Sequence, residues 1–135
     1  MTPGQTMATR REARERALAL CYELETKGES ADTVLDALPA PPDEYTVTLV
    51  RGVGDHRAEL DEWLGTYSER WAVERMPAVD RAVLRIGSYE LGWEPELPVG
   101  VVIDEAVELA RQYSTADSGR FVHALLARIA DQVRT

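Results

Sequence analysis

Cysteine and long apolar runs are scarce in this sequence of 135 residues, and each scarcity excludes a class of protein. The single cysteine, Cys21, cannot form an internal disulfide, and such cysteine usage is typical of a reducing cytoplasm. Charged residues interrupt every apolar run well short of the roughly 20 residues that a membrane-spanning helix needs. The N-terminus has no apolar segment of the kind found in signal peptides. We therefore expect a cytoplasmic protein without membrane contacts.

Motifs of catalytic and metal sites are also missing. The chain has no glycine-rich phosphate loop, CxxC, HExxH or GxSxG. His56 and His123 stand 67 positions apart, and neither has a second His or Cys at the spacing of a zinc site. Carboxylate pairs such as Glu105 and Glu108 fit a solvated helix face better than an acid–base pair. We expect no enzymatic activity, no metal and no cofactor.

The charge of the chain is acidic overall and unevenly distributed. The net charge is −9, and 14 of the 15 basic residues are arginine. Residues 1–22 carry a balance of +2, whereas residues 23–135 carry a balance of −11. Binding to a polyanion depends on the field at the contact rather than on the sum over the molecule. The composition therefore argues against non-specific nucleic-acid binding and leaves a local contact near the N-terminus open.

Apolar residues recur at helical spacing along most of the chain, and no segment shows the alternation of a strand. We expect an all-α protein of about seven helices, forming a single domain over residues 10–135 after a flexible tail over residues 1–9. Gly28 is the expected C-cap of the first helix and Ser30 the N-cap of the second. The expected helices cover residues 10–27, 31–38, 43–64, 67–74, 79–91 and 99–113, with a last helix through Phe121 and Val133.

The segment "RREARER" is the first candidate binding feature. Arg10 and Arg14 are four positions apart, and Arg11 and Arg14 are three apart, so a helix would present them as one basic patch. Arginine suits phosphate because its planar guanidinium donates hydrogen bonds in pairs. Pairing with Glu12 and Glu15 within the helix accounts for the same arginines without a ligand, and spacing alone does not separate the two interpretations.

The segment "ARQYSTADSGRFVHALLAR", residues 110–128, is the second. Its "STAD" has the form of a capping box, in which Ser114 and Asp117 only start a helix. That interpretation leaves Tyr113 and Arg120 unexplained. A helix N-terminus with an arginine and an exposed aromatic ring nearby can hold a phosphate and stack an unpaired base. From this segment alone, the helix cap is the better supported interpretation.

Three segments in the later half of the chain resemble the family of the transcription antitermination factor NusB. The family patterns V-D-R-A-x-L-R-x-x-x-Y-E-L, P-x-x-V-x-I-[ND]-E-A-V-E-L-A and D-S-x-[KR]-F-V-N-G-x-L appear at Val79–Leu91, Pro98–Ala110 and Asp117–Leu126. Looser matches lie at Ala13–Ala17 and Leu49–Val53. The chain departs from the family at a few positions, which are His123-Ala124 for Asn-Gly, Asp104 for Asn and Ala19 for Gln.

The resemblance implies an all-α fold of two small helical sub-bundles, placed here at roughly residues 10–76 and 77–135. It also implies a non-catalytic protein that binds boxA RNA in the leader of ribosomal RNA transcripts. Binding would occur together with NusE, a small-subunit ribosomal protein, within the antitermination complex of RNA polymerase. Because the N-terminal arginines are few and are interrupted by acids, we expect weak binding to boxA alone and useful binding with NusE.

The resemblance also assigns residues to these surfaces. The RNA surface would combine the first helix with the start of the last one, through Arg10, Arg11, Arg14, Tyr22, Tyr113, Asp117, Arg120 and Phe121. The NusE surface would use Glu74, Arg75, Arg81 and Glu90.

Two alternatives remain open at this stage. The first is a self-associating helical protein, a homodimer with an occluded RNA face, for which an exposed Trp93 is a candidate anchor. The second is a NusB-like RNA-binding module related to ribosomal RNA methyltransferases. Because the sequence has neither a nucleotide-binding βαβ pattern nor a catalytic cysteine motif, we do not expect a methyltransferase.

Overall fold

The computed structural model describes residues 9–134, and within that range the chain is all-α, as predicted. Its helices are α1 (Arg10–Lys27), α2 (Ala31–Asp36), α3 (Glu44–Asp55), α4 (Arg57–Tyr67), α5 (Ala78–Trp93), α6 (Val99–Tyr113) and α7 (Ser118–Val133), with a 3-10 turn η1 (Val73–Arg75) before α5. None of these helices is both long and apolar enough to cross a membrane. The predicted tail lies outside the described residues, apart from Thr9.

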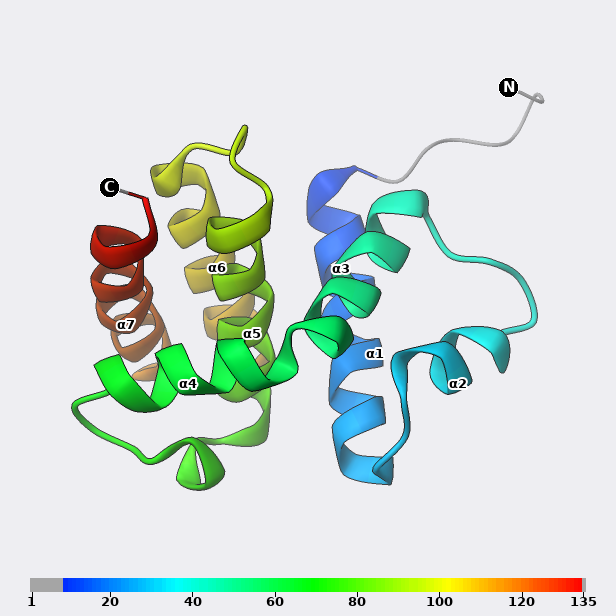
Figure 1. The fold of residues 1–135 in the computed structure, drawn as a ribbon, viewed down its shortest axis with the longest axis horizontal. Helices are drawn as coiled ribbons and strands as arrows, with labels where there is room; N and C mark the ends of the chain where they lie inside the picture. The colour runs from blue at the N-terminus through cyan, green and yellow to red at the C-terminus, as the bar shows by residue number, and fades with distance from the viewer. Residues whose placement is uncertain (1–8, 135) are drawn as a thin grey trace.

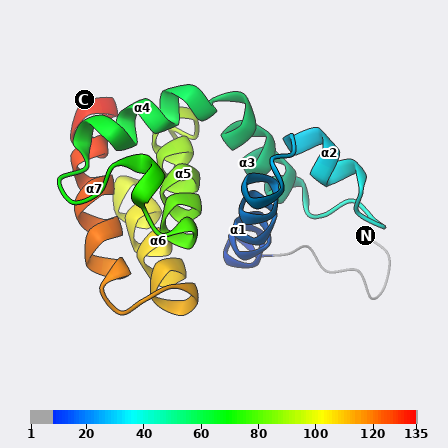
Figure 2. The same cartoon turned by 90° about the horizontal axis from the view of Figure 1, so that it is seen from below.

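The helices form two groups, which lie side by side in Figure 1. One group contains α1, α2 and α3, and the other contains α4, α6 and α7 around α5. This grouping differs from the division predicted near residue 76, because α4 packs on α5 and α7. The groups separate instead at His56, between α3 and α4, and α5 contacts α1 and α3 across the boundary. Figure 2 shows the same division from below.

Local capping fixes both ends of α1. The Thr9 hydroxyl accepts a hydrogen bond from the Glu12 N–H, and the Thr9 N–H donates to the Glu12 carboxylate, each at 3.1 Å. This is a reciprocal capping box. At the other end Gly28 adopts φ +66°, a left-handed conformation that glycine reaches without a Cβ clash. The predicted caps at Gly28 and at Ser30, whose hydroxyl accepts from the Thr33 N–H, are confirmed.

The single helix predicted over residues 43–64 is in fact two helices. α3 ends at Asp55, and α4 begins at Arg57 after His56 turns the backbone with φ −109° and ψ 16°. The apolar pattern continues through this break, because both helices bury one face against α5. Gly52 lies directly against Tyr89 of α5, and a Cβ at Gly52 would stand 2.2 Å from that ring. Glycine therefore allows the close crossing of α3 and α5.

The helix predicted over residues 67–74 is also wrong. The chain leaves α4 at Ser68 in an extended conformation, and only η1 is helical before α5. The Ser68 hydroxyl donates to the Trp71 carbonyl at 2.7 Å and accepts from the Trp71 N–H at 3.2 Å. These bonds close a local turn that competes with helix formation.

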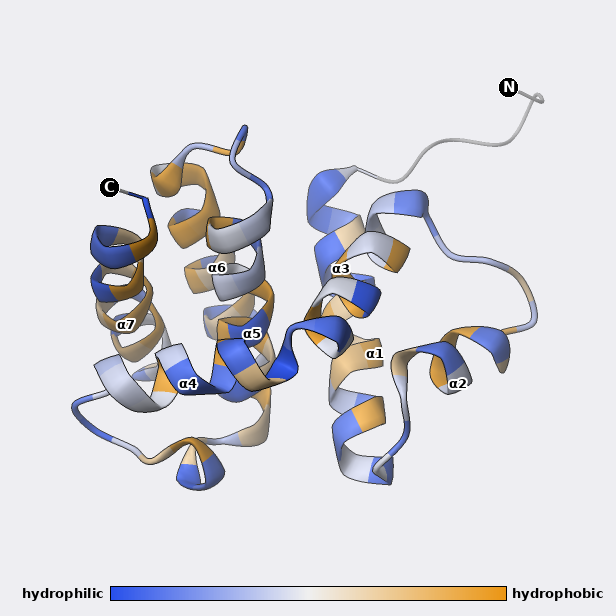
Figure 3. Cartoon of the chain, in the orientation of Figure 1, coloured by the Kyte–Doolittle hydropathy of each residue, from blue (hydrophilic) through white to orange (hydrophobic). Residues whose placement is uncertain are grey.

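Apolar side chains form one core that runs through both groups. In Figure 3 the apolar stretches of α6 and α7 face each other and α5. The largest fully buried apolar side chains are Leu49, Leu60, Leu64, Leu84, Ile86, Leu91, Leu125, Leu126, Ile129, Val34 and Val50. Cys21 belongs to this core, and burial raises the pKa of its thiol to about 12, which suits a packing residue and not a nucleophile.

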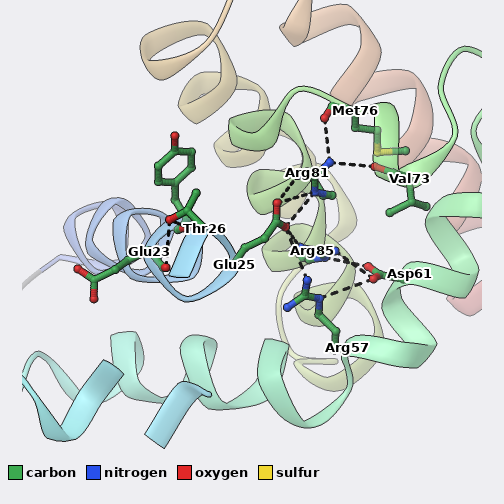
Figure 4. A network of polar contacts seen from close by, with 10 residues as sticks. Glu23, Glu25, Thr26, Arg57, Asp61, Val73, Met76, Arg81 and Arg85 are labelled. Carbon is green, nitrogen blue, oxygen red and sulfur yellow. Dashed lines mark hydrogen bonds and ion pairs between the residues drawn. The ribbon is translucent and has the colours of Figure 1, made fainter. Parts of the chain in front are cut away.

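Charged side chains join the two groups where α1 meets α5 (Figure 4). Glu25 of α1 accepts hydrogen bonds from Arg81 and Arg85 of α5, and Asp61 of α4 accepts from Arg85 at 2.8 and 3.0 Å. Hydrogen bonding from Arg81, followed by that from Arg85, lowers the pKa of Glu25 to about 2. Glu25 is therefore an anion at neutral pH and couples the two helical groups.

Candidate RNA interface

The first helix lies beside α6, up to Tyr113, the last residue of α6 before the connection to α7. Arg11 of α1 donates to Glu105 of α6 at 3.0 and 3.1 Å across 94 positions of sequence. One turn further along α1, Glu15 accepts from the Tyr113 hydroxyl at 2.5 Å across 98 positions. These contacts bring the two segments singled out in the sequence into one surface.

A hollow of about 360 Å³ opens between these segments. Its walls are Leu18, Ala19 and Tyr22 of α1 on one side, and Val79 and Tyr113 on the other. Tyr22 and Tyr113 are 43% and 45% exposed, and among the described residues only Val101 is another large apolar side chain of such exposure. Exposed aromatic rings beside an apolar floor are suited to stacking on unpaired bases.

The exposed arginines of α1 have partners that the sequence did not indicate. Arg10 lies over the Tyr45 ring of α3, 3.6 Å from its centroid, and Arg11 keeps 60% of its side chain exposed while paired with Glu105. Glu12 is occupied in the capping box and Glu15 with Tyr113, so the proposed pairing within α1 is not formed. Arg16, which the sequence interpretation did not select, is exposed and has no carboxylate within 4.0 Å among the described residues.

Arg14 does not belong to the exposed basic patch, and that prediction is wrong. Its side chain is 4% exposed and its Nε donates to both carboxylate oxygens of Glu90 at 3.0 and 3.2 Å. The Tyr45 hydroxyl donates to the same carboxylate. The periodicity contains the missed signal: Arg14, Leu18 and Cys21 stand at i, i+4 and i+7, which places Arg14 on the buried stripe.

Glu90 is the other half of this pair, and its expected place on a partner surface is wrong for the same reason. The residue is 1% exposed and faces α1 and α3 through Arg14 and Tyr45. Burial, followed by the nearby Glu90, raises the pKa of Tyr45 far above its ordinary value, so the phenol remains a hydrogen-bond donor. The cluster therefore fixes the position of α1 on α5.

A buried aspartate, Asp80 of α5, shapes the connection between α6 and α7. The Ser114 hydroxyl donates to it at 2.5 Å and the Ser118 hydroxyl at 2.9 Å, and Asp80 is 2% exposed. The predicted capping box is wrong, because α7 starts at Ser118 and Asp117, its N-cap, makes no side-chain cap bond. Asp80 was not among the predicted site residues, since its partners lie 34 and 38 positions away.

The remaining residues of this turn divide between surface and core. Arg120 and Asp117 are exposed, and Arg120 lines a second hollow of about 350 Å³ with Arg111 and His123. Phe121 is 7% exposed, so its predicted place in an exposed RNA surface is wrong, and its ring packs in the core. A Cβ at Gly119 would lie 3.1 Å from the Arg111 side chain, so glycine allows α7 to pass close to Arg111.

The candidate contacts for a protein partner are only partly on the surface. Glu74 and Arg75 are exposed in η1. Arg81 is held inside the ionic cluster of Figure 4 and also donates to the carbonyls of Val73 and Met76 at 3.0 and 2.9 Å. Trp93, expected to be exposed, is half-buried and stacked on neighbouring rings.

No group of three or more His, Cys, Asp or Glu side chains within residues 9–134 is arranged to hold a metal ion.

Comparison with known proteins places this arrangement in a family. The model of the NusB family matches residues 11–131. The transcription antitermination protein NusB of Saccharopolyspora erythraea is 51% identical and that of Kineococcus radiotolerans 48% identical, with 92% and 96% of this chain and 88% and 98% of those proteins covered.

Solved structures agree with the sequence comparison. The NusB structure of T. maritima superposes with a TM-score of 0.83 at 32% identity, covering 94% of both chains. A crystal structure of antitermination factors NusB and NusE in complex with double-stranded RNA gives a TM-score of 0.77 at 26% identity, covering 90% of this chain and 96% of that one. With the seven helices of residues 9–134 in this arrangement, the chain belongs to the NusB family of transcription antitermination proteins, which are not enzymes.

Proposed function

We propose that this protein binds single-stranded, boxA-type RNA of ribosomal RNA leaders in the hollow between α1 and α6. It does so in the cytoplasm, together with the ribosomal protein NusE, as part of the antitermination complex of RNA polymerase. The observation that carries the proposal is the pair of exposed tyrosines, Tyr22 and Tyr113, on opposite walls of the hollow. The likeness to a chain solved with NusE and double-stranded RNA supports RNA and NusE as partners, whereas the single-stranded form of the RNA rests on the tyrosines.

The chemistry of the hollow fits unpaired bases. Tyr113 is fixed by its hydrogen bond to Glu15, so one ring is already oriented before a base arrives. Stacking of a base on an aromatic side chain contributes about 1–3 kcal/mol, and every base has a face that can stack. The exposed Arg10, Arg11 and Arg16 of α1, the helix that forms one wall of the hollow, are candidate contacts for the phosphates, and Arg120 of α7 is a further candidate at the second hollow.

The small number of unpaired arginines limits how tightly the protein binds RNA without NusE. Arg14 is paired with Glu90 and Arg11 with Glu105, so of the four arginines of α1 only Arg10 and Arg16 are exposed without a paired carboxylate among the described residues. Each phosphate contact on single-stranded nucleic acid contributes a salt slope of about −0.7. A site with so few contacts binds weakly and with a shallow salt dependence. NusE supplies the additional contacts, and the exposed Glu74 and Arg75 are candidates for meeting it.

The test is fluorescence anisotropy of labelled boxA RNA with the full chain at two salt concentrations, with and without NusE. Tyr22→Ala and Tyr113→Ala should each weaken binding about tenfold, which corresponds to roughly 1.4 kcal/mol. Val101→Ala is the matched control, because Val101 has the same exposure outside the hollow. Equal losses in all three variants, or a preference for duplex over single-stranded RNA, would contradict a stacking site.

A homodimer that covers the hollow is the second candidate, because the exposed tyrosines also make an apolar patch. Light scattering with and without RNA separates the two. A monomer that binds RNA supports the open hollow. A dimer that dissociates when RNA is added would mean that self-association occludes the same surface.

A further inference from the structure

Four aromatic rings stack where α3 and α4 meet the C-terminal end of α5, and we call this cluster, His56, Trp63, Tyr89 and Trp93, the aromatic face. The His56 and Trp93 rings lie 3.9 Å apart between centroids at an angle of 18°. Trp63 stacks on Trp93 at 5.4 Å and Tyr89 stacks on it at 5.9 Å. Trp93 is therefore the centre of a nearly parallel stack.

Two glycines and a helix break build this stack. Gly52 of α3 and Gly92 of α5 leave room for the rings, since a Cβ would stand 2.2 Å from Tyr89 at the first and 2.8 Å from Trp63 at the second. His56 occupies the break between α3 and α4 and keeps 32% of its side chain exposed. Trp63 and Trp93 are half-buried, so the stack forms part of the surface.

Carboxylates surround the aromatic face. Glu94 accepts a hydrogen bond from the Tyr89 hydroxyl at 3.1 Å, and Glu59 lies 4.0 Å from His56. Burial, with a further contribution from Glu96, raises the pKa of Glu94 above its ordinary value, and Arg10 counteracts this without reversing it. Asp55 likewise contributes to raising the pKa of the Tyr89 hydroxyl. The rim therefore carries more carboxylates than cations: the cations near Glu94 among the described residues are Arg10 and Arg134, whose Nη2 donates to the Glu94 carbonyl at 3.1 Å.

The aromatic face is separate from the tyrosine hollow. Val79 of the hollow and Trp93 are 14 positions apart on α5, which corresponds to about 21 Å along the helix axis. In Figure 2 the α3–α4 junction and the α6–α7 connection lie on opposite sides of α5. Both surfaces can therefore be occupied at once.

We propose that the aromatic face is a docking surface for a basic segment of a partner protein, which places an arginine against the solvent-exposed parts of His56 and Trp93. Charge complementarity identifies the occupant, because Asp55, Glu59, Glu94 and Glu96 attract cations and repel the phosphates of RNA. A guanidinium is planar and stacks on aromatic rings while donating to carboxylates beside them, which an ammonium does less well. Half-exposed tryptophans are also the residues that most often anchor protein interfaces. The inference does not depend on the RNA role of the tyrosine hollow.

Intrinsic tryptophan fluorescence reports on this surface directly. In a Trp71→Phe background the remaining tryptophans are the two of the aromatic face. A short peptide of alternating arginine and glycine should change their emission saturably, and the matching lysine peptide should bind several-fold more weakly. A Glu94→Gln, Glu96→Gln variant should lose the response.

The matched control is Asp104→Asn with Glu108→Gln, which removes two exposed carboxylates of α6, a helix that packs on α5 and α7 rather than on α3 and α4. If this control weakens binding as much as the Glu94→Gln, Glu96→Gln change, the peptide senses only net charge and the docking surface is refuted. No saturable response to the arginine peptide refutes it as well. Tyr22→Ala with Tyr113→Ala should leave the response intact, and its loss there would overturn the separate location.

Discussion

Replacing Arg14 distinguishes the structural arginine of α1 from the neighbouring arginines that are proposed to contact RNA. In Arg14→Ala the Glu90 carboxylate, whose side chain is 2% exposed, loses its charged partner and keeps only the Tyr45 hydroxyl. Breaking a buried ion pair in this way costs about 3–5 kcal/mol. Arg11→Ala removes a pair that is 60% exposed at the arginine, for which about 0–1 kcal/mol is typical.

For a chain of this length, roughly 3–4 °C of melting temperature is lost per kcal/mol, so Arg14→Ala should lower it by about 10–20 °C and Arg11→Ala by a few degrees at most. Thermal and urea unfolding followed by circular dichroism measure both. RNA anisotropy below the melting temperature should show the reverse order, with the larger loss of affinity in Arg11→Ala.

The double variant Arg14→Met, Glu90→Leu serves as the control. Apolar replacement of a buried pair is often neutral, so it should recover much of the lost stability, less the hydrogen bond of Tyr45. The reasoning is refuted if the free energy of unfolding of Arg14→Ala lies within about 1 kcal/mol of the parent value while the variant no longer binds RNA. Arg14 would then face the ligand and not Glu90.

Three further predictions concern the scaffold of the site. The folded-state pKa of Glu25, about 2, lies below its ordinary value of 4.5, so the contribution of Glu25 to stability is complete above pH 4.5 and is lost as pH falls toward 2. Urea unfolding over this pH range should show the loss, and Arg81→Met should make the pH dependence shallower. Asp80→Ala removes the acceptor of two hydroxyl donors and should cost roughly 2–4 kcal/mol, with weaker RNA binding because the α6–α7 turn loosens; Asp80→Asn, which keeps one acceptor, should cost less in the same melts. Gly52→Ala should lower the free energy of unfolding by about 1–3 kcal/mol, because the added Cβ displaces the Tyr89 ring. Since Tyr89 stacks on Trp93, the tryptophan emission of the folded variant should change as well.

Sequence patterns predicted the elements that local chemistry determines. The bounds of α6 follow from Pro98 and from a clear helical period, and the end of α1 follows from Gly28. The break at His56 was missed because the apolar stripes of α3 and α4 both face α5, so the period continues although the helix does not. Tertiary packing decided that boundary.

Partners distant in sequence explain the errors at the candidate site. Ser114 fits a local capping box, yet its hydroxyl bonds to Asp80, 34 positions earlier. Arg14 fits a surface patch by its charge, yet Glu90, 76 positions later, makes it a buried residue. Tyr22 was selected through the family resemblance, and the structure shows both tyrosine rings exposed, although the bond from Tyr113 to Glu15 was not predicted. Buried polar pairs become visible only when both helices are placed.

The tyrosine hollow has one wall on each side of the division between the helical groups, since Tyr22 belongs to α1 whereas Val79 and Tyr113 belong to α5 and α6. Its width is consequently set at a distance, by the ion pairs that Arg14 and Glu25 make with α5. A small rotation of α1 about those pairs changes the spacing of the two rings without altering either ring. RNA affinity at the proposed site should therefore depend on how firmly α1 is held against α5.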